Sequence, residues 1–205
     1  MNYKSEEIIP YKTNKRSKRE QVAEMFDGIA SRYDSLNSWL SLGMDMWWRK
    51  RALRKLKNYN ANHMLDIATG TGDFAIQACS ILKPKSIVGV DISDGMMEVG
   101  YEKVKKAQLD SIISFQHQDC ASMTFANESF DLAIAAFGVR NFEDIDASFK
   151  EIVRVLQPGG VFMFLELTTP QYQPIKFFYN VYSKSFIPFI TRLLSKDKKA
   201  YDYLP

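Results

Sequence analysis

The feature that most constrains the fold is an alternation of short apolar runs with helix-like segments from residue 61 onward. The apolar runs read as strands, and they are HMLDIA, SIVGVD, IISFQHQ, FDLAIAAF and VFMFLELT. Between them, residues 73–83, 94–108 and 144–156 show helical spacing, and QPGG at 157–160 is expected to be a loop. Such alternation is typical of an α/β fold, so we predict a mainly parallel sheet with helices on both faces.

A helical cap is expected before this core, over residues 20–57. The stretch VAEMFDGIASRYDSLNSWLSLGMDMWWRKRALRKL looks helical, with breaks near Asn37 and Gly43. Residues 1–19 are basic, and we expect them to form a flexible N-terminus. With 46% hydrophobic residues, the remaining 20–205 can bury one sizeable core, so we predict a single domain.

Composition argues against several classes of protein. The two cysteines and two histidines form no metal-binding or disulfide pattern, so we expect no metal. No apolar run reaches the roughly 18 residues that span a bilayer, and no secretory signal is present, so we expect a cytoplasmic protein.

Charge is distributed unevenly along the chain. Residues 1–20 carry a net charge of +3 and residues 171–205 carry +4, against −4 for the residues between them. Basic ends can attract nucleic acid or anionic membranes, although scattered lysines are more often solvated surface; we expect no nucleic-acid partner.

A glycine turn in MLDIATGTGDFAIQ indicates a cofactor site. The dinucleotide fingerprint GxGxxA, with an acid further on, fits Gly70, Gly72, Ala75 and Asp91. In a nicotinamide site, however, Asp73 would add negative charge beside the pyrophosphate. S-adenosylmethionine carries no phosphate and presents a sulfonium and an ammonium, which Asp66 and Asp73 would attract. The sequence therefore favours S-adenosylmethionine.

Further cofactor contacts are expected where the strands end. The backbone of Gly70, Thr71 and Gly72 would approach the cofactor closely. Asp91 would accept hydrogen bonds from the ribose hydroxyls, with a helix-capping acid as the alternative. Asp119 would receive the adenine amino group, and the amide of Cys120 would donate to a ring nitrogen, unless both are ordinary turn residues.

Together these motifs resemble the ubiquinone/menaquinone biosynthesis C-methyltransferase family, which belongs to the class I S-adenosylmethionine-dependent methyltransferases. The resemblance covers residues 20–205 and is carried by YDSLNSWLSLGMDMWW, DIATGTGD, VDISDGMM, SFDLAIAAFGVRNF and RVLQPGGVFMFLE. It implies a Rossmann-like fold with a seven-stranded sheet, whose last strand pair would follow residue 205 and is expected to be missing. Asp45 stands where the family usually has histidine. Ala136 stands where many relatives have serine, so we leave Ala136 out of the site.

The resemblance also implies a reaction, the transfer of a methyl group to a ring carbon of a polyprenyl quinol such as demethylmenaquinol. Ionising a phenol with a pKa of about 10 makes the ortho carbon nucleophilic. Arg140 and Asn141, in FGVRN, are expected at the carboxyl edge of the sheet on the substrate side. Arg140 would stabilise the phenolate or order a water. The alternative for Arg140 is a surface ion pair with Glu143 or Asp144.

Three cap residues and one C-terminal stripe complete the expected substrate region. Tyr33, Asp34 and Asp45 would shape the quinol pocket, although simple packing explains them equally well. An apolar stripe at helical spacing suits a helix that faces a membrane-borne substrate, with a core helix as the alternative: Ile175, Phe178, Tyr179, Tyr182 and Phe186. Peripheral contact with the inner face of the cytoplasmic membrane is therefore left open.

Several alternatives stay open at this stage. The acceptor ring could be the benzoquinol of ubiquinone biosynthesis instead of a naphthoquinol. An oxidoreductase of the NAD type would use the same glycine fingerprint, and a non-catalytic cofactor-binding protein would serve as a partner in an assembly. The sequence does not decide the oligomeric state, a homodimer included.

Overall fold

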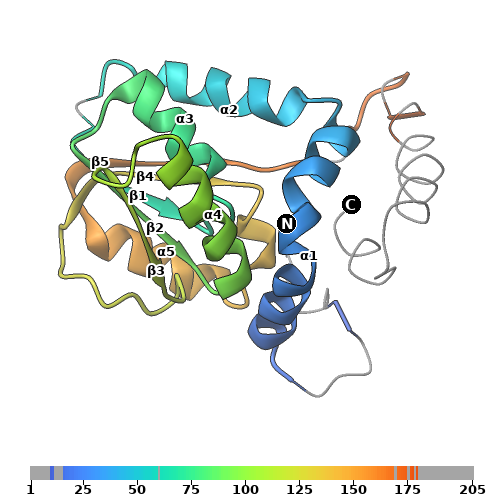
Figure 1. Cartoon of the computed structure of the whole chain (residues 1–205), viewed down its shortest axis with the longest axis horizontal. Helices are drawn as coiled ribbons and strands as arrows, with labels where there is room; N and C mark the ends of the chain where they lie inside the picture. Colours follow the sequence, from blue (N-terminus) through green and yellow to red (C-terminus); the bar gives the residue numbers. More distant parts are fainter. Residues whose placement is uncertain are drawn as a thin grey trace.

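The computed structural model describes residues 10–11, 16–59, 61–168, 170–174, 176–177 and 179. Its elements follow one another as α1 (Lys18–Ser41), α2 (Met44–Lys55), β1 (His63–Ile67), α3 (Asp73–Leu82), β2 (Ser86–Asp91), α4 (Asp94–Lys106), β3 (Ile113–His117), β4 (Phe130–Ala136), the short helix η2 (Val139–Asn141), α5 (Ile145–Val155) and β5 (Leu156–Leu165) (Figure 1). The predicted alternation of strands and helices is confirmed.

The strands form one parallel, five-stranded sheet in the order β3-β2-β1-β4-β5. From β1 the chain passes through α3 to β2, whereas β4 lies on the other side of β1. The strand order therefore reverses between β1 and β4. Open parallel sheets bind ligands outside the carboxyl ends of the strands at such a reversal. The predicted Rossmann-like architecture is confirmed, and within the described residues the sheet has fewer strands than the seven that the resemblance implies.

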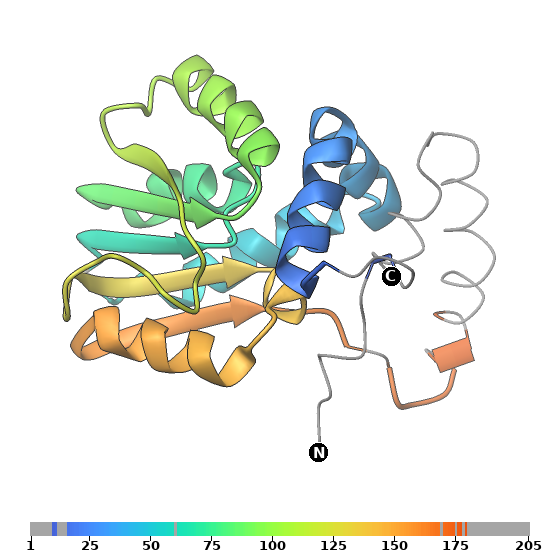
Figure 2. The same ribbon diagram turned by 90° about the horizontal axis from the view of Figure 1, so that it is seen from below.

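Alternating residues of the central strands build two separate cores. Met64 and Ile134 are fully buried in a cluster with the apolar faces of α2, α3 and α4. Leu65 and Ala133, their chain neighbours, are fully buried on the opposite face, where α5 contributes Ile152. Figure 2 shows α4 and α5 on opposite sides of the sheet. Burial on both faces explains why these strands read as continuous apolar runs, and it confirms that helices cover both faces.

The N-terminal cap consists of two helices. Residue Ser17 caps α1, because its hydroxyl accepts the N–H of Glu20 while the Glu20 carboxylate accepts the N–H of Ser17, so α1 begins earlier than expected. The predicted break at Asn37 was wrong, since α1 continues through it. The chain turns instead at Leu42 and Gly43, with positive φ of 52° and 74°. Helix α1 packs against α4 and α2 against α3, which confirms the helical cap.

Strand β5 starts before the predicted position. We expected residues 157–160 to form a separate loop, yet Leu156 already pairs with Phe130 of β4. The next pair joins Leu132 to Val161, so the register shifts and the four residues between lie in an irregularity of the strand. Gly159 adopts a φ of 81° there. Glycine and proline marked an irregular segment correctly, but its assignment as a loop outside the sheet was wrong.

Most of the C-terminal apolar stripe lies outside the described residues, namely Ile175, Phe178, Tyr182 and Phe186. Tyr179 is described and half-buried. In the part of the chain that the structure describes, no helix is both long enough and apolar enough to cross a bilayer.

Candidate active site

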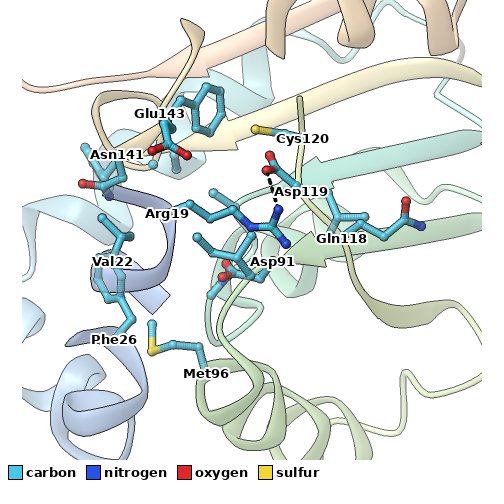
Figure 3. A pocket seen from close by; sticks show the side chains of 18 of the residues that line it. Arg19, Val22, Phe26, Asp91, Met96, Gln118, Asp119, Cys120, Asn141 and Glu143 are labelled. Atoms are coloured by element: carbon cyan, nitrogen blue, oxygen red, sulfur yellow. Dashed lines mark hydrogen bonds and ion pairs between the residues drawn. The ribbon is translucent and has the colours of Figure 1, made fainter. Parts of the chain in front are cut away.

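A cleft opens at the carboxyl edge of the sheet, beside the reversal between β1 and β4 (Figure 3). It encloses about 740 Å³ with its open mouth included. Its walls come from the segments that follow β1, β2, β3 and β4, together with side chains of α1.

The glycine turn forms one wall of the cleft. Gly70 and Gly72 adopt φ values of 56° and 77°, which favour glycine. A Cβ atom on Gly72 would lie 2.8 Å from the Phe115 ring, closer than side chains tolerate. Gly70 lines the cleft, whereas Thr71 and Gly72 are not among the described residues that line it. The turn therefore brings backbone to the cleft at Gly70.

Asp91, at the end of β2, lines the cleft. Its Oδ2 accepts the N–H of Gly70 at 2.8 Å, and its Oδ1 accepts the N–H of Ser93 at 2.9 Å. Burial raises the pKa of this carboxyl, and the backbone bonds oppose that rise. The helix-capping alternative was wrong, because Ser93 caps α4. Each carboxylate oxygen has further acceptor capacity, so Asp91 can also bind hydroxyl groups of a ligand.

Asp119 and Cys120 follow β3 and line the same cleft. The Oδ1 of Asp119 accepts the N–H of Ala121 at 2.9 Å, and its Oδ2 lies 3.3 Å from Nη1 of Arg19 (Figure 3). Burial raises the pKa of Cys120 to about 12, so its thiol stays protonated at neutral pH. Sequence reasoning missed Arg19, because one arginine in the basic run KTNKRSKRE carries no signal of a partner at residue 119.

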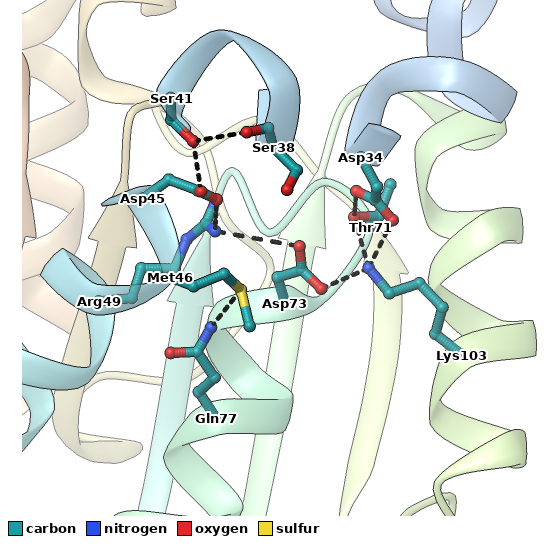
Figure 4. Close-up of polar contacts among 10 residues, drawn as sticks. All are labelled: Asp34, Ser38, Ser41, Asp45, Met46, Arg49, Thr71, Asp73, Gln77 and Lys103. Carbon is teal, nitrogen blue, oxygen red and sulfur yellow. Dashed lines mark hydrogen bonds and ion pairs between the residues drawn. The ribbon is translucent and has the colours of Figure 1, made fainter. Parts of the chain in front are cut away.

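The two acids that flank the glycine turn do not line the cleft. Asp66 is 1% exposed and accepts the Thr69 hydroxyl at 2.7 Å, and burial raises its pKa to about 7. Asp73 forms an ion pair with Lys103 and lies 3.9 Å from Nη1 of Arg49 (Figure 4). Its charge is thus compensated. The electrostatic argument against a pyrophosphate assumed an unpaired Asp73, and that premise was wrong.

Two predicted cap residues of α1 occupy different surroundings. Tyr33 lines the cleft, and burial raises its pKa, which the nearby positive charges of Arg49 and Arg140 oppose. Asp34 accepts the Thr71 hydroxyl at 2.6 Å and the Lys103 ammonium at 2.6 Å (Figure 4). Asp34 therefore ties the cap to the glycine turn, and Tyr33 is the one of the two that faces the cleft.

Asp45 lies behind the wall of the cleft. It is buried within α2, where it pairs with Arg49 at 2.7 Å and accepts the Ser41 hydroxyl at 2.6 Å. The Arg49 guanidinium lies 5.3 Å from the centre of the Phe137 ring, and Phe137 lines the cleft. Asp45 itself is not among the described lining residues.

The two site residues predicted in FGVRN occupy different positions. Asn141 lines the cleft from η2. Arg140 donates its backbone N–H to Glu166 at 3.2 Å, and its Nε lies 3.7 Å from the same carboxylate. The alternative partners were wrong: Glu143 accepts a backbone N–H of α1, and Asp144 caps α5. Arg140 is not among the described residues that line the cleft, although its positive charge affects the pKa of Tyr33.

Two further residues correct the sequence analysis. Ala136, which we left out of the predicted site, lines the cleft at the end of β4. Lys18, which was not predicted, is 5% exposed and donates from Nζ to the carbonyl oxygens of Arg140 at 3.1 Å and Phe142 at 2.9 Å. Burial lowers the pKa of Lys18. The first turn of α1 is therefore fixed to η2.

The cleft combines carboxylates with apolar and aromatic walls. Asp91 and Asp119 supply acceptors, while Phe26, Met96 and Phe137 supply apolar surface. Such a set suits a ligand that carries both hydroxyl groups and a flat ring, as a nucleoside does. Among the described residues, no three acidic, histidine or cysteine side chains gather where they could hold a metal ion.

Comparison with known proteins identifies the family. Residues 13–205 match the ubiE/COQ5 methyltransferase family. The chain is 53% identical to a demethylmenaquinone methyltransferase of Bacteroides fragilis, over 100% of this chain and 83% of that protein. It is 43% identical to the ubiquinone/menaquinone biosynthesis C-methyltransferase UbiE of Geotalea daltonii, over 92% and 80% of the two chains. A solved SAM-dependent methyltransferase of Aquifex aeolicus shares the fold, with a TM-score of 0.54 at 15% identity over 66% of this chain and 77% of that one. The chain belongs to the ubiE/COQ5 methyltransferase family.

Proposed function

We propose that this protein transfers the methyl group of S-adenosylmethionine to a ring carbon of demethylmenaquinol and thereby forms menaquinol. The observation that carries the proposal is the 53% identity, over the whole chain, to a relative named demethylmenaquinone methyltransferase. The benzoquinol of ubiquinone biosynthesis is the second candidate, because the name of the Geotalea daltonii relative covers both pathways. The higher identity favours the naphthoquinol. Membership of a methyltransferase family argues against the NAD-type and non-catalytic alternatives.

The residues of the cleft fit S-adenosylmethionine. In this proposal Asp91 accepts the ribose hydroxyls, since both of its oxygens retain acceptor capacity after binding Gly70 and Ser93. Asp119 and the Cys120 amide face the adenine, and the Arg19 guanidinium can stack on that ring. When bound, S-adenosylmethionine supplies an electrophilic methyl group.

The protein must also lower the cost of ionising the quinol hydroxyl. Tyr33 remains protonated at neutral pH because its pKa is raised, so it can donate a hydrogen bond to a phenolate. Asn141 supplies a second neutral donor in the cleft. Arg140 lies outside the cleft, but its positive charge opposes the rise in the pKa of Tyr33, and it would stabilise a phenolate in the same way. We assign Arg140 to stabilising the phenolate, and Tyr33 and Asn141 to binding it directly.

The substrate indicates the cellular location of the protein. A polyprenyl tail keeps the quinol in the bilayer, so we infer a cytoplasmic protein that contacts the inner face of the cytoplasmic membrane peripherally. No nucleic-acid partner is part of this proposal.

A competition between two acceptors tests the proposal. Short-chain demethylmenaquinol and the corresponding demethylated benzoquinol, both reduced, are supplied together with S-adenosylmethionine, and the methylated products are separated by chromatography. We expect the naphthoquinol product to dominate. Dominance of the benzoquinol product would move the protein to the ubiquinone pathway. Methylation of neither quinol by protein that binds the cofactor would overturn the proposed function.

A further inference from the structure

We propose that the corner between α1 and α2 is a docking surface for an anionic lipid bilayer. The inference rests on the proposed function, which places the substrate in a membrane. We call this surface the docking corner, and it comprises the exposed apolar side chains of residues 39–47 and the exposed basic side chains of residues 50–55.

The apolar part of the docking corner is unusually exposed. Five large side chains are exposed there, with exposed fractions of 67%, 71%, 47%, 38% and 53% for Trp39, Leu42, Met44, Met46 and Trp47. The left-handed turn at Leu42 and Gly43 separates the two helices and places these side chains around it. Single exposed apolar residues are ordinary, but several large ones within one turn indicate an interaction surface.

Basic side chains continue this surface along α2. Lys50, Arg51, Arg54 and Lys55 are all exposed. In residues 35–57 the one acid is Asp45, which is buried and paired with Arg49, so it does not compensate these charges. The Arg51 guanidinium lies 5.4 Å from the centre of the Trp47 ring, which joins the apolar and basic parts. Tryptophan and leucine beside lysine and arginine are the combination that binds the interface of anionic membranes.

The charge also distinguishes a bilayer from the other surfaces that could cover this corner. Residues 171–205 of the same chain sum to +4, so they would bring like charge to it. A second copy of the chain, related by a twofold axis, would oppose the same basic residues to themselves. Anionic headgroups complement the basic part, and the acyl region accepts the tryptophans. The bilayer is therefore the occupant that both parts favour.

The docking corner is continuous with the wall of the cleft. Trp48 lies next to the exposed Trp47 on α2, and its ring packs edge-on against Phe137 at 6.3 Å between centroids. Phe137 lines the cleft. Figure 1 shows α2 running along the outer surface of the molecule over α3. Docking through this corner would thus hold the membrane against the helix whose other side packs on the wall of the cleft.

Vesicle binding tests the proposal with an internal reporter. Two of the three tryptophans, Trp39 and Trp47, belong to the docking corner, and the third, Trp48, lies beside it on α2, so tryptophan emission reports mainly on this region. We expect the protein to sediment with vesicles of phosphatidylcholine and phosphatidylglycerol, but weakly with phosphatidylcholine alone. Tryptophan emission should shift to shorter wavelength on binding, and added salt should reverse the shift. Equal binding to both vesicles would overturn the proposal.

Matched variants separate this corner from the general surface. Arg54→Glu with Lys55→Glu should weaken binding to anionic vesicles by at least about tenfold. The control, Lys105→Glu with Lys106→Glu, changes exposed lysines in the last turn of α4 and should leave binding intact. Leu42→Glu should likewise weaken binding, whereas Val153→Glu, equally exposed at 71%, should not. Equal effects in variants and controls would refute the assignment.

Two measurements keep this inference separate from the proposed function. Acrylamide should quench the tryptophan emission of the protein alone, and protection from quenching would show that another part of the protein covers the corner. Methyl transfer to a short-chain quinol in solution should be unchanged in Leu42→Glu. If wild-type protein binds vesicles as expected but methylates no quinol, the proposed function fails and the docking corner stands. If it methylates the soluble quinol but ignores vesicles, the docking corner fails.

Discussion

Replacing Asp91 with alanine removes the acceptor that we assign to the cofactor ribose. A hydrogen bond to a charged group contributes about 1.5–3 kcal/mol. The burial that raises the pKa of Asp91 is present before the cofactor binds, so it does not enter the difference in affinity, and water can replace part of the lost acceptor capacity around the ribose hydroxyls. We therefore expect a net loss of about 1.5–3 kcal/mol, which weakens S-adenosylmethionine binding roughly 10- to 150-fold.

The same substitution has a separate effect on stability. The N–H groups of Gly70 and Ser93 lose their acceptor, at about 0.5–1.5 kcal/mol each, so the melting temperature should fall by a few degrees. Asp91→Asn serves as the control, because its one oxygen can satisfy only one of these N–H groups and its affinity should be intermediate. Calorimetric titration with S-adenosylmethionine and a melting curve measure the two effects. Wild-type affinity in a folded Asp91→Ala protein would refute the ribose assignment.

Three further substitutions or reactions test other residues of the site. Arg140→Gln removes the positive charge that we assign to stabilising the phenolate, so turnover at saturating cofactor should fall at least about tenfold, about 1.4 kcal/mol; if Arg140 only pairs with Glu166, turnover should persist at a stability cost under about 1 kcal/mol. The pKa of Asp66 is raised to about 7 in the folded protein. This group therefore contributes to the free energy of unfolding fully below the pKa that it has in the unfolded chain, and the contribution is lost as the pH rises through 7. That loss is on the order of 4 kcal/mol, so Asp66→Asn should melt above wild type at pH 8, and identical pH dependence of the two melting temperatures would contradict this. Cys120, with its pKa raised to about 12, should resist iodoacetamide at pH 8 in the folded protein, and rapid labelling seen by mass spectrometry would contradict the raised pKa.

The sequence predicted the parts of the site that follow from strand periodicity. Asp91 and Asp119 each come directly after an apolar run, and parallel strands bring their carboxyl ends to one edge of a sheet. That rule places both residues in one cleft without knowledge of any side-chain contact, and the structure brings them together there. The cap of α4 is equally local, because Ser93 stands directly before a helical run and a serine there is a capping signal.

Contacts between distant segments were not predictable in the same way. Arg19 and Lys18 meet their partners only because α1 folds back over the sheet edge, and no local pattern encodes that packing. Asp73 was interpreted as unpaired because Lys103 lies in a different helix, where its direction depends on how α4 packs. Asn37 is a weak helix former, yet α1 continues through it because tertiary contacts outweigh such small preferences.

The most direct test of the proposed function follows the methyl group itself. Purified protein is incubated with S-adenosylmethionine carrying a deuterated methyl group and with short-chain demethylmenaquinol, and the product is examined by mass spectrometry and NMR. We expect the label on the ring carbon, and we expect it only with the reduced quinol, because the ring becomes nucleophilic through its phenol. Label on a phenolic oxygen, equal labelling of the oxidised quinone, or no labelled product from protein that binds the cofactor would contradict the proposed C-methylation.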